Sequence, residues 1–170
     1  MSASGSKPVP AIGFLTICDF GDSGVCGGYL VLNAAGRPLE FHCTAPVKAN
    51  RAQEILYGPT LRPFLFGEQI GQTLITRSKV EALVVVTDVE AALAVRPFVS
   101  MPVVNLVGDV EKPAHPAVLV LNKQSAAVER GHPRDAEAVK QFWPQHFEAF
   151  DLREPFGRIR EALDESRKAA

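Results

Sequence analysis

IGFLTICD (12–19) and ALVVVTD (82–88) are two short apolar runs that each end in an aspartate. Runs of this length and composition predict buried β-strands with a polar residue at the carboxyl end. Between them, GGYLVLN (27–33) and PLEFHCT (38–44) predict a hairpin, because turn residues including Gly36 separate the two runs. Pro38 lacks an N–H, so the second arm is expected at a sheet edge. This order of elements decides the fold.

Helical and strand patterns alternate after the hairpin. We expect a helix from about Ala49 to Tyr57, a break at Gly58-Pro59, and a second helical stretch to about Thr76. Strand 82–88, a short helix (90–95) and a buried strand (102–107) then imply parallel strands with right-handed crossovers. The sequence therefore predicts an α/β domain. Its mixed sheet begins with an antiparallel three-strand meander, continues with parallel strands and is flanked by helices.

The remaining third of the chain is expected to be mostly helical. We predict a surface loop (108–116), one further strand (117–121) and C-terminal helices within 133–168. These helices are placed at 133–142 and 155–168, with a hinge at 144–151.

Length and composition indicate one globular domain. The 170 residues are 46% apolar and 22% charged, so we expect a single domain over 11–170 preceded by a flexible tail, 1–10. No signal peptide and no membrane-spanning run is recognised, which predicts a cytoplasmic protein. With 18 basic against 19 acidic residues and a net charge of −1, strong nonspecific nucleic-acid binding is not expected.

Asp19 and Asp88 are the first candidates for chemistry. If their strands are neighbours and parallel, both carboxylates are expected in one crevice at the carboxyl end of the sheet, and a nearby helix could add Glu54. Oxygen ligands gathered in this way suit Mg²⁺ or Mn²⁺. The alternative is that both aspartates simply end strands and cap the turns that follow.

Several short motifs, in order along the chain, resemble the ribonuclease H family. The likeness rests on these pieces: Asp19 in CDF, Gly27-Gly28-Tyr29, Gly36-Arg37, Asn50-Arg51, Thr87-Asp88 and Gly131-His132-Pro133 before a helix.

This resemblance implies a ribonuclease H-like fold and metal-dependent hydrolysis of the RNA strand in RNA–DNA hybrids. Asp19, Glu54 and Asp88 would hold two Mg²⁺ ions. The acid on the late helix would be Asp135 or Glu137, and His132 would be the catalytic histidine of the preceding loop. One hypothesis is therefore a metal-dependent nuclease.

The other hypothesis is a catalytically inactive scaffold or protein-binding subunit with the same fold. Gln53 stands at the family's helix glutamate, and Val139 stands where the late acid is expected. The segment 57–75 is more apolar than a one-sided helix needs, which predicts a self-association or partner surface.

Other motifs predict no chemistry. Cys18, Cys26 and Cys43 show no zinc spacing and are interpreted as reduced thiols in or near the core. No phosphate-binding glycine loop is present, so no nucleotide cofactor is expected. The GDSG sequence around Ser23 is interpreted as a turn and not as a protease motif.

Overall fold

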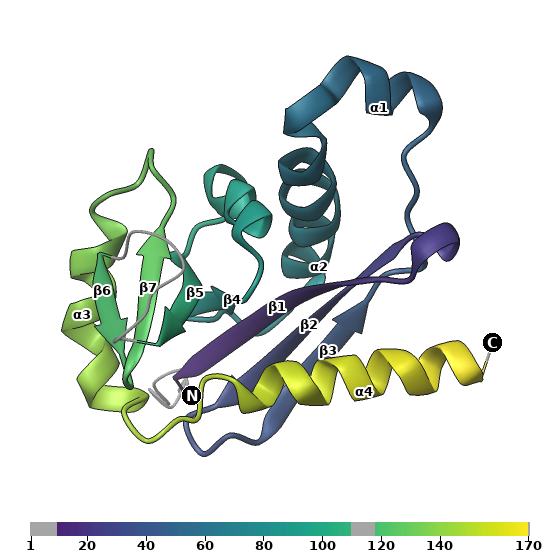
Figure 1. Cartoon of the computed structure of the whole chain (residues 1–170). Helices are drawn as coiled ribbons and strands as arrows, with labels where there is room; N and C mark the ends of the chain where they lie inside the picture. Colours follow the sequence, from purple (N-terminus) through teal and green to yellow (C-terminus); the bar gives the residue numbers. More distant parts are fainter. Residues whose placement is uncertain (1–9, 110–117, 170) are drawn as a thin grey trace, which may run out of the picture.

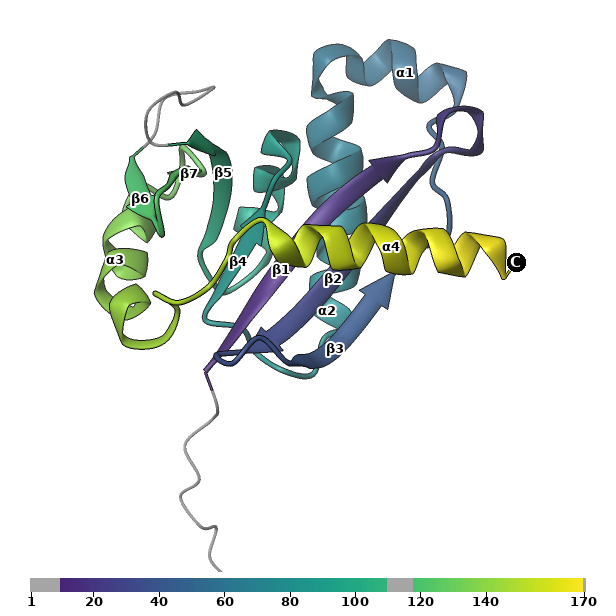
Figure 2. The same cartoon turned by 60° about the horizontal axis from the view of Figure 1, so that its bottom comes forward.

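A seven-stranded mixed sheet forms the centre of the computed structural model, which describes residues 10–109 and 118–169 (Figures 1 and 2). The strand order is β3-β2-β1-β4-β5-β7-β6. The strands are β1 (Ala11–Asp19), β2 (Val25–Asn33), β3 (Pro38–Cys43), β4 (Val84–Thr87), β5 (Val103–Asp109), β6 (Leu119–Leu121) and β7 (Gln124–Val128). The α/β class is confirmed, and the architecture is compatible with a ribonuclease H-like fold.

The antiparallel meander has the predicted hairpin. β1 pairs with β2 and β2 with β3, both antiparallel, and β3 is at the edge of the sheet. Asn33 Oδ1 accepts hydrogen bonds from the backbone N–H groups of Ala35 and Arg37, and Gly36 takes a φ of 82°. The turn chemistry read from the sequence is therefore the one that closes the hairpin.

β4 and β5 are parallel neighbours, as the strand-helix-strand pattern predicts. β4 pairs in parallel with β1 on one side and with β5 on the other. All four residues of β4 are buried, as its continuous apolar pattern indicates. The strands that carry Asp19 and Asp88 are therefore neighbours.

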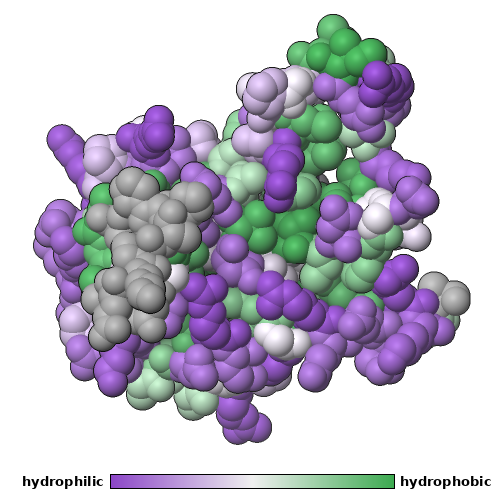
Figure 3. All heavy atoms as spheres, viewed as in Figure 1, coloured by the Kyte–Doolittle hydropathy of each residue, from purple (hydrophilic) through white to green (hydrophobic). Residues whose placement is uncertain are grey.

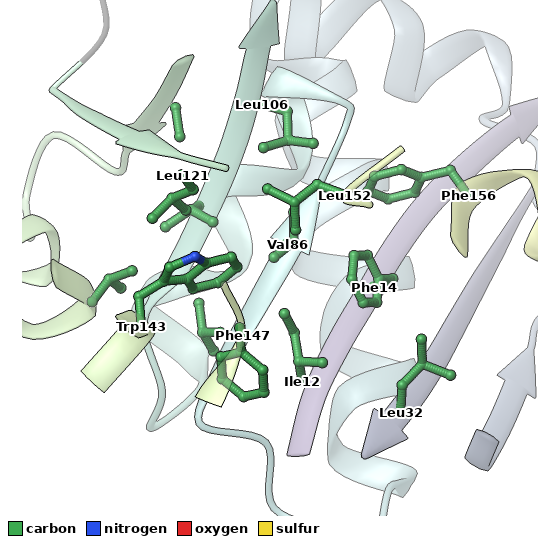
Figure 4. Close-up of a cluster of buried hydrophobic side chains, with 14 of the residues drawn as sticks. Ile12, Phe14, Leu32, Val86, Leu106, Leu121, Trp143, Phe147, Leu152 and Phe156 are labelled. Carbon is green, nitrogen blue, oxygen red and sulfur yellow. The ribbon is translucent and has the colours of Figure 1, made fainter. Parts of the chain in front are cut away.

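Helices cover the two faces of the sheet. On one face lie η3, a π-helical segment, together with α2 and η4, and their buried side chains pack with Leu15, Val85 and Val103. On the other face lie α3 and α4, and their core includes the side chains in Figure 4. The helical elements are η1 (Gly21–Ser23), α1 (Arg51–Tyr57), η2 (Gly58–Thr60), η3 (Pro63–Gly71), α2 (Gln72–Arg77), η4 (Glu90–Phe98), α3 (Asp135–His146) and α4 (Glu154–Lys168).

Two adjacent glycines of β2 let helices of both layers approach the sheet. A Cβ at Gly27 would lie 2.2 Å from Ile70 Cγ2 of η3, and one at Gly28 would lie 2.4 Å from Ile159 Cγ2 of α4. Real Cβ atoms do not come this close to other carbons. The Gly-Gly pair is thus a packing requirement of this fold, because successive strand residues point to opposite faces.

Three predictions about the last third of the chain need correction. The strand β7 was missed, since QSAAV lacks the β-branched and apolar alternation of a typical strand. α3 continues through Pro144 to His146, so the expected hinge at 144–151 begins inside a helix. Gly108 and Asp109 belong to β5, while 110–116 of the predicted loop lie outside the described residues. Almost all of the predicted tail lies outside them too.

The partner surface at 57–75 stays a prediction, but much of the apolar excess behind it is accounted for within the protein. Five of its apolar side chains are buried in the protein's own core, because η3 packs against η4 and the sheet. They are Leu65, Phe66, Ile70, Leu74 and Ile75.

Candidate site at the carboxyl ends of β1 and β4

The parallel register brings Thr16, and not Asp19, beside Asp88. Leu15 is the Cα partner of Thr87, so the next residues along the two strands are Thr16 and Asp88. Thr16 is fully buried, and its Oγ1 donates a hydrogen bond of 2.6 Å to Asp88 Oδ1. The strand end therefore orients the Asp88 carboxylate through one of its two oxygens.

Arg160 of α4 occupies the other oxygen. Its Nη2 donates to Asp88 Oδ2 and lies 3.5 Å from Thr16 Oγ1. The Asp88 side chain is 9% exposed and that of Arg160 is 49% exposed, so the pair sits at the rim of the core with the guanidinium reaching in from solvent. This contact links α4 to the carboxyl ends of β1 and β4.

Asp19 lies away from this carboxylate. It is three residues beyond Thr16, a distance of about 10 Å along a strand. Alternation also puts it on the face of Leu15 and Ile17, which pack with η3 and α2, whereas Asp88 is held on the α4 side. Asp19 is exposed, and its Oδ1 accepts from Gly21 N at 2.9 Å. The two aspartates thus do not share the predicted crevice.

Glu54 lies on α1 and is paired locally. Its Oε2 is 3.3 Å from Arg51 Nη1, with both side chains exposed. The neighbouring Gln53 forms a capping box with Asn50, in which each side chain bonds the other residue's backbone N–H. Residues 50–54 therefore start a helix, and no contact joins them to Asp88.

His132 lies in the loop before α3, and Asp135 lies in the first turn of α3. Asp135 is 6% exposed and accepts two hydrogen bonds from Arg96, of 2.6 Å and 3.2 Å. His132 Nδ1 lies 2.7 Å from Glu129 Oε2. Glu137, the alternative late acid, is exposed and pairs with Lys140. None of these groups contacts Asp88 in the structure.

Cys18 and Asp164 belong to the same neighbourhood as Asp88. Burial raises the pKa of the Cys18 thiol, the positive charge of Arg160 lowers it, and the negative charges of Asp88 and Asp164 raise it further, so the net shift is upward. Arg160, Asp88 and Asp164 thus all act electrostatically on this thiol. Among the described residues, no group of three or more His, Cys, Asp or Glu side chains is arranged to hold a metal ion.

Sequence reasoning missed Thr16, Arg160 and Asp164. A signal for the last two was present, because the apolar stripe of α4 includes Phe156 and Leu163 and therefore orients the positions between them. Thr16 could not be found without the strand register.

No family model matches the sequence, and no curated protein matches it. Among solved structures, two of Endonuclease V from Ciona intestinalis are similar, each bound to DNA that contains an inosine followed by a ribo-adenosine. Both show 12% identity and a TM-score of 0.35, and both cover 81% of this chain. The chain spans 55% and 56% of their lengths.

No helix among the described residues is long and apolar enough to cross a membrane.

Proposed function

We propose that this chain is a non-catalytic binding domain with ribonuclease H-like architecture. The observation that carries the proposal is the pairing of Asp88, whose two carboxylate oxygens accept hydrogen bonds from Thr16 and Arg160. The guanidinium supplies the positive charge that a metal ion would otherwise bring to this carboxylate. Asp88 then serves to fasten α4 to the sheet.

Metal binding at Asp88 would require displacement of Arg160. A hydrogen bond to a charged group contributes about 1.5–3 kcal/mol, and a divalent ion at this point would gain Asp88 and at most one neighbouring carboxylate, Asp164, without Asp19. Mg²⁺ binds weakly to so few carboxylates because it gives up its water ligands reluctantly. The local energetics therefore favour the ion pair over an occupied metal site.

The binding surface that we propose is the helical arm α1. Figure 3 shows apolar atoms gathered over this arm, where Ile55 and Leu56 are 64% and 82% exposed. α1 buries no residue, yet the capping box starts it and the Tyr57 ring stacks on Phe64 at 4.2 Å. An ordered helix that presents apolar side chains to water is typical of an interaction surface.

A second copy of this chain is the occupant that we propose for the arm. Arg51 and Glu54 cancel each other's charge on α1, so two arms can approach without repulsion. Sedimentation velocity over a concentration series should show weak self-association. Leu56→Glu should abolish it, while Ala52→Glu places the same charge on the same helix at a small residue and should have a lesser effect. A wild type that stays monomeric at all concentrations contradicts the role of the arm.

The non-catalytic assignment is tested separately. Wild type, Asp88→Asn and Asp19→Asn are titrated with Mn²⁺ by calorimetry and incubated with RNA–DNA hybrid, duplex and single-stranded substrates in Mg²⁺. We expect no saturable binding and no cleavage by any of the three. Cleavage by the wild type that disappears in Asp88→Asn would refute the proposal.

A second candidate function is a nuclease that uses Mg²⁺ or Mn²⁺ at Asp88 and Asp164. The favouring observation is that Asp164 lies one helical turn from Arg160 and acts on Cys18 together with Asp88. Since Arg160 is 49% exposed, a substrate phosphate could draw its guanidinium away and free the carboxylate. This candidate predicts that metal binding requires substrate, that Asp164→Asn removes metal binding and that Asp19→Asn does not.

The cytoplasmic location stays a prediction of the sequence.

A further inference from the structure

A cleft of about 930 Å³ opens between η4 and the sheet face formed by β5 and β7. Its walls are largely apolar: Leu93 and Ala94 come from η4, Val107 from β5 and Ala127 from β7. A volume of this size is typical of small-molecule sites. We call this feature the η4–β5 cleft.

Asn105 is the polar residue on the floor of this cleft. It is 2% exposed, and its Oδ1 is buried without a hydrogen-bond partner among the residues that the structure describes. Alternation along β5 places Val104 and Leu106 in the core beneath α3, so Asn105 and Val107 face the cleft. The neighbouring Thr87 hydroxyl is already used, because it accepts from Val89 N at 3.2 Å.

A buried amide oxygen without a partner is rare in folded proteins. Leaving such an acceptor unsatisfied is unfavourable, and most buried polar groups in folded proteins have partners. The sequence VVNLV of β5 would complete an apolar strand if residue 105 were Val or Leu. Oδ1 is itself closed to solvent, so a donor from the cleft would satisfy it once the Asn105 side chain turns towards the cleft, and the amide would then be a recognition group for something that enters there.

Charges at the rim of the cleft are balanced. Arg62 and Arg130 are opposed by Glu90 and Glu129. The Arg62 guanidinium lies 5.1 Å from the centre of the Phe66 ring, and Glu129 accepts from Gly131 N. Two charges of each sign give no preference for an anionic or a cationic ligand, which favours a neutral one.

We propose that the η4–β5 cleft binds a neutral, planar heteroaromatic molecule that carries an amino group beside a ring nitrogen. The apolar walls contact the faces of the ring, and the amino group donates to Asn105 Oδ1. The Asn105 amide nitrogen can donate to the adjacent ring nitrogen, because a carboxamide matches such an edge in a two-point contact. This inference goes beyond the proposed function and concerns a different site, so it holds whether or not Asp88 binds metal.

The test compares two probes that differ in one amino group. 9-Methyladenine carries an amino group beside a ring nitrogen, whereas 9-methylpurine has no N–H donor. Binding to the ¹⁵N-labelled wild type is followed by NMR, which also reports on the side-chain amide of Asn105. We expect saturable shifts with 9-methyladenine and at least about tenfold weaker binding of 9-methylpurine, as the loss of one hydrogen bond of the two-point contact implies.

Two variants locate the site. Asn105→Leu removes the acceptor, and Ala127→Phe fills the cleft while keeping Asn105. Each should weaken 9-methyladenine binding at least about tenfold while its backbone spectrum remains that of the folded protein. Equal binding by wild type and Asn105→Leu, equal binding of the two probes, or no binding to the wild type would overturn the proposal. Adenosine monophosphate binding tenfold tighter than adenosine would overturn the preference for a neutral ligand.

Discussion

The ion pair between Arg96 and Asp135 connects the two helical layers. Arg96 belongs to η4, on one face of the sheet, and Asp135 opens α3 on the other. The guanidinium donates to both carboxylate oxygens, and its Nη1 also donates to Val99 O at 2.9 Å. The side chains are 15% and 9% exposed, so water reaches neither end of the pair freely. Asp135 thus links η4 to the first turn of α3.

Removal of the Asp135 charge should be strongly destabilising. Asp135→Ala leaves a buried guanidinium without its counter-charge, which costs about 3–5 kcal/mol in comparable pairs. For a chain of this length each kcal/mol shifts the melting temperature by about 2–4 °C, so a fall of about 6–20 °C is expected. The double replacement Arg96→Met with Asp135→Leu removes both charges and should restore most of the stability, because apolar substitutes for a buried pair are often neutral.

Urea denaturation of wild type, Asp135→Ala and the double variant measures these differences in the free energy of unfolding. Glu137→Gln is the matched control, since that carboxylate is two residues away and 75% exposed, and its loss should change stability by less than about 0.5 kcal/mol. If Asp135→Ala is no more destabilising than the control, the reasoning from burial is wrong. Asp135 would then be free for the metal role that the sequence predicted.

Two further predictions concern single carboxylates. Burial raises the pKa of Glu40, but hydrogen bonds from Ser78 Oγ and Lys79 N lower it by more than burial raises it. The net pKa is therefore below its ordinary value. Ionised Glu40 therefore adds stability above pH about 4.3, and this stability is lost as the pH falls through the lowered pKa. The variant Glu40→Gln should be less stable than wild type at pH 7 and should lose less stability than wild type between pH 7 and pH 3. Urea titrations at both pH values measure these differences. Asp19→Asn should leave unfolding unchanged within about 0.5 kcal/mol, since an amide oxygen can also accept from Gly21 N, and a loss above about 1 kcal/mol would contradict a role confined to that turn.

Hydrophobic pattern and turn chemistry were sufficient to predict the antiparallel meander of β1, β2 and β3 and the buried strand β4. The continuous apolar run of β4 indicates burial on both faces, and Asn33 with Gly36 specifies the hairpin. These signals are local, because a few neighbouring residues determine them. That β1 and β4 are neighbours was a condition of the site prediction and did not follow from these signals, because β2, β3 and several helical segments separate the two strands along the chain.

The candidate site could not be predicted in the same way because it depends on register. A shift of three residues between β1 and β4 decides whether Asp88 faces Thr16 or Asp19, and no local pattern fixes that shift. β7 was missed for a related reason: Ser125 and Ala126 are buried by the fold around them, although neither favours a strand on its own. The segment 57–75 has more apolar residues than a one-sided helix needs, because η3 within it packs against η4, which lies in a separate part of the sequence.

Both proposals rest on the satisfaction of hydrogen bonds and not on residue type. Each carboxylate that the sequence marked as catalytic has protein partners: Asp19 has Gly21 N, Glu54 has Arg51, Asp88 has Thr16 and Arg160, and Asp135 has Arg96. Asn105, which no motif singled out, is buried in a cleft with its oxygen unpaired among the described residues. A satisfied group already stabilises the folded chain, whereas an unsatisfied one costs stability until something binds it. A search for the ligand of this protein should therefore begin at Asn105 and not at the aspartates.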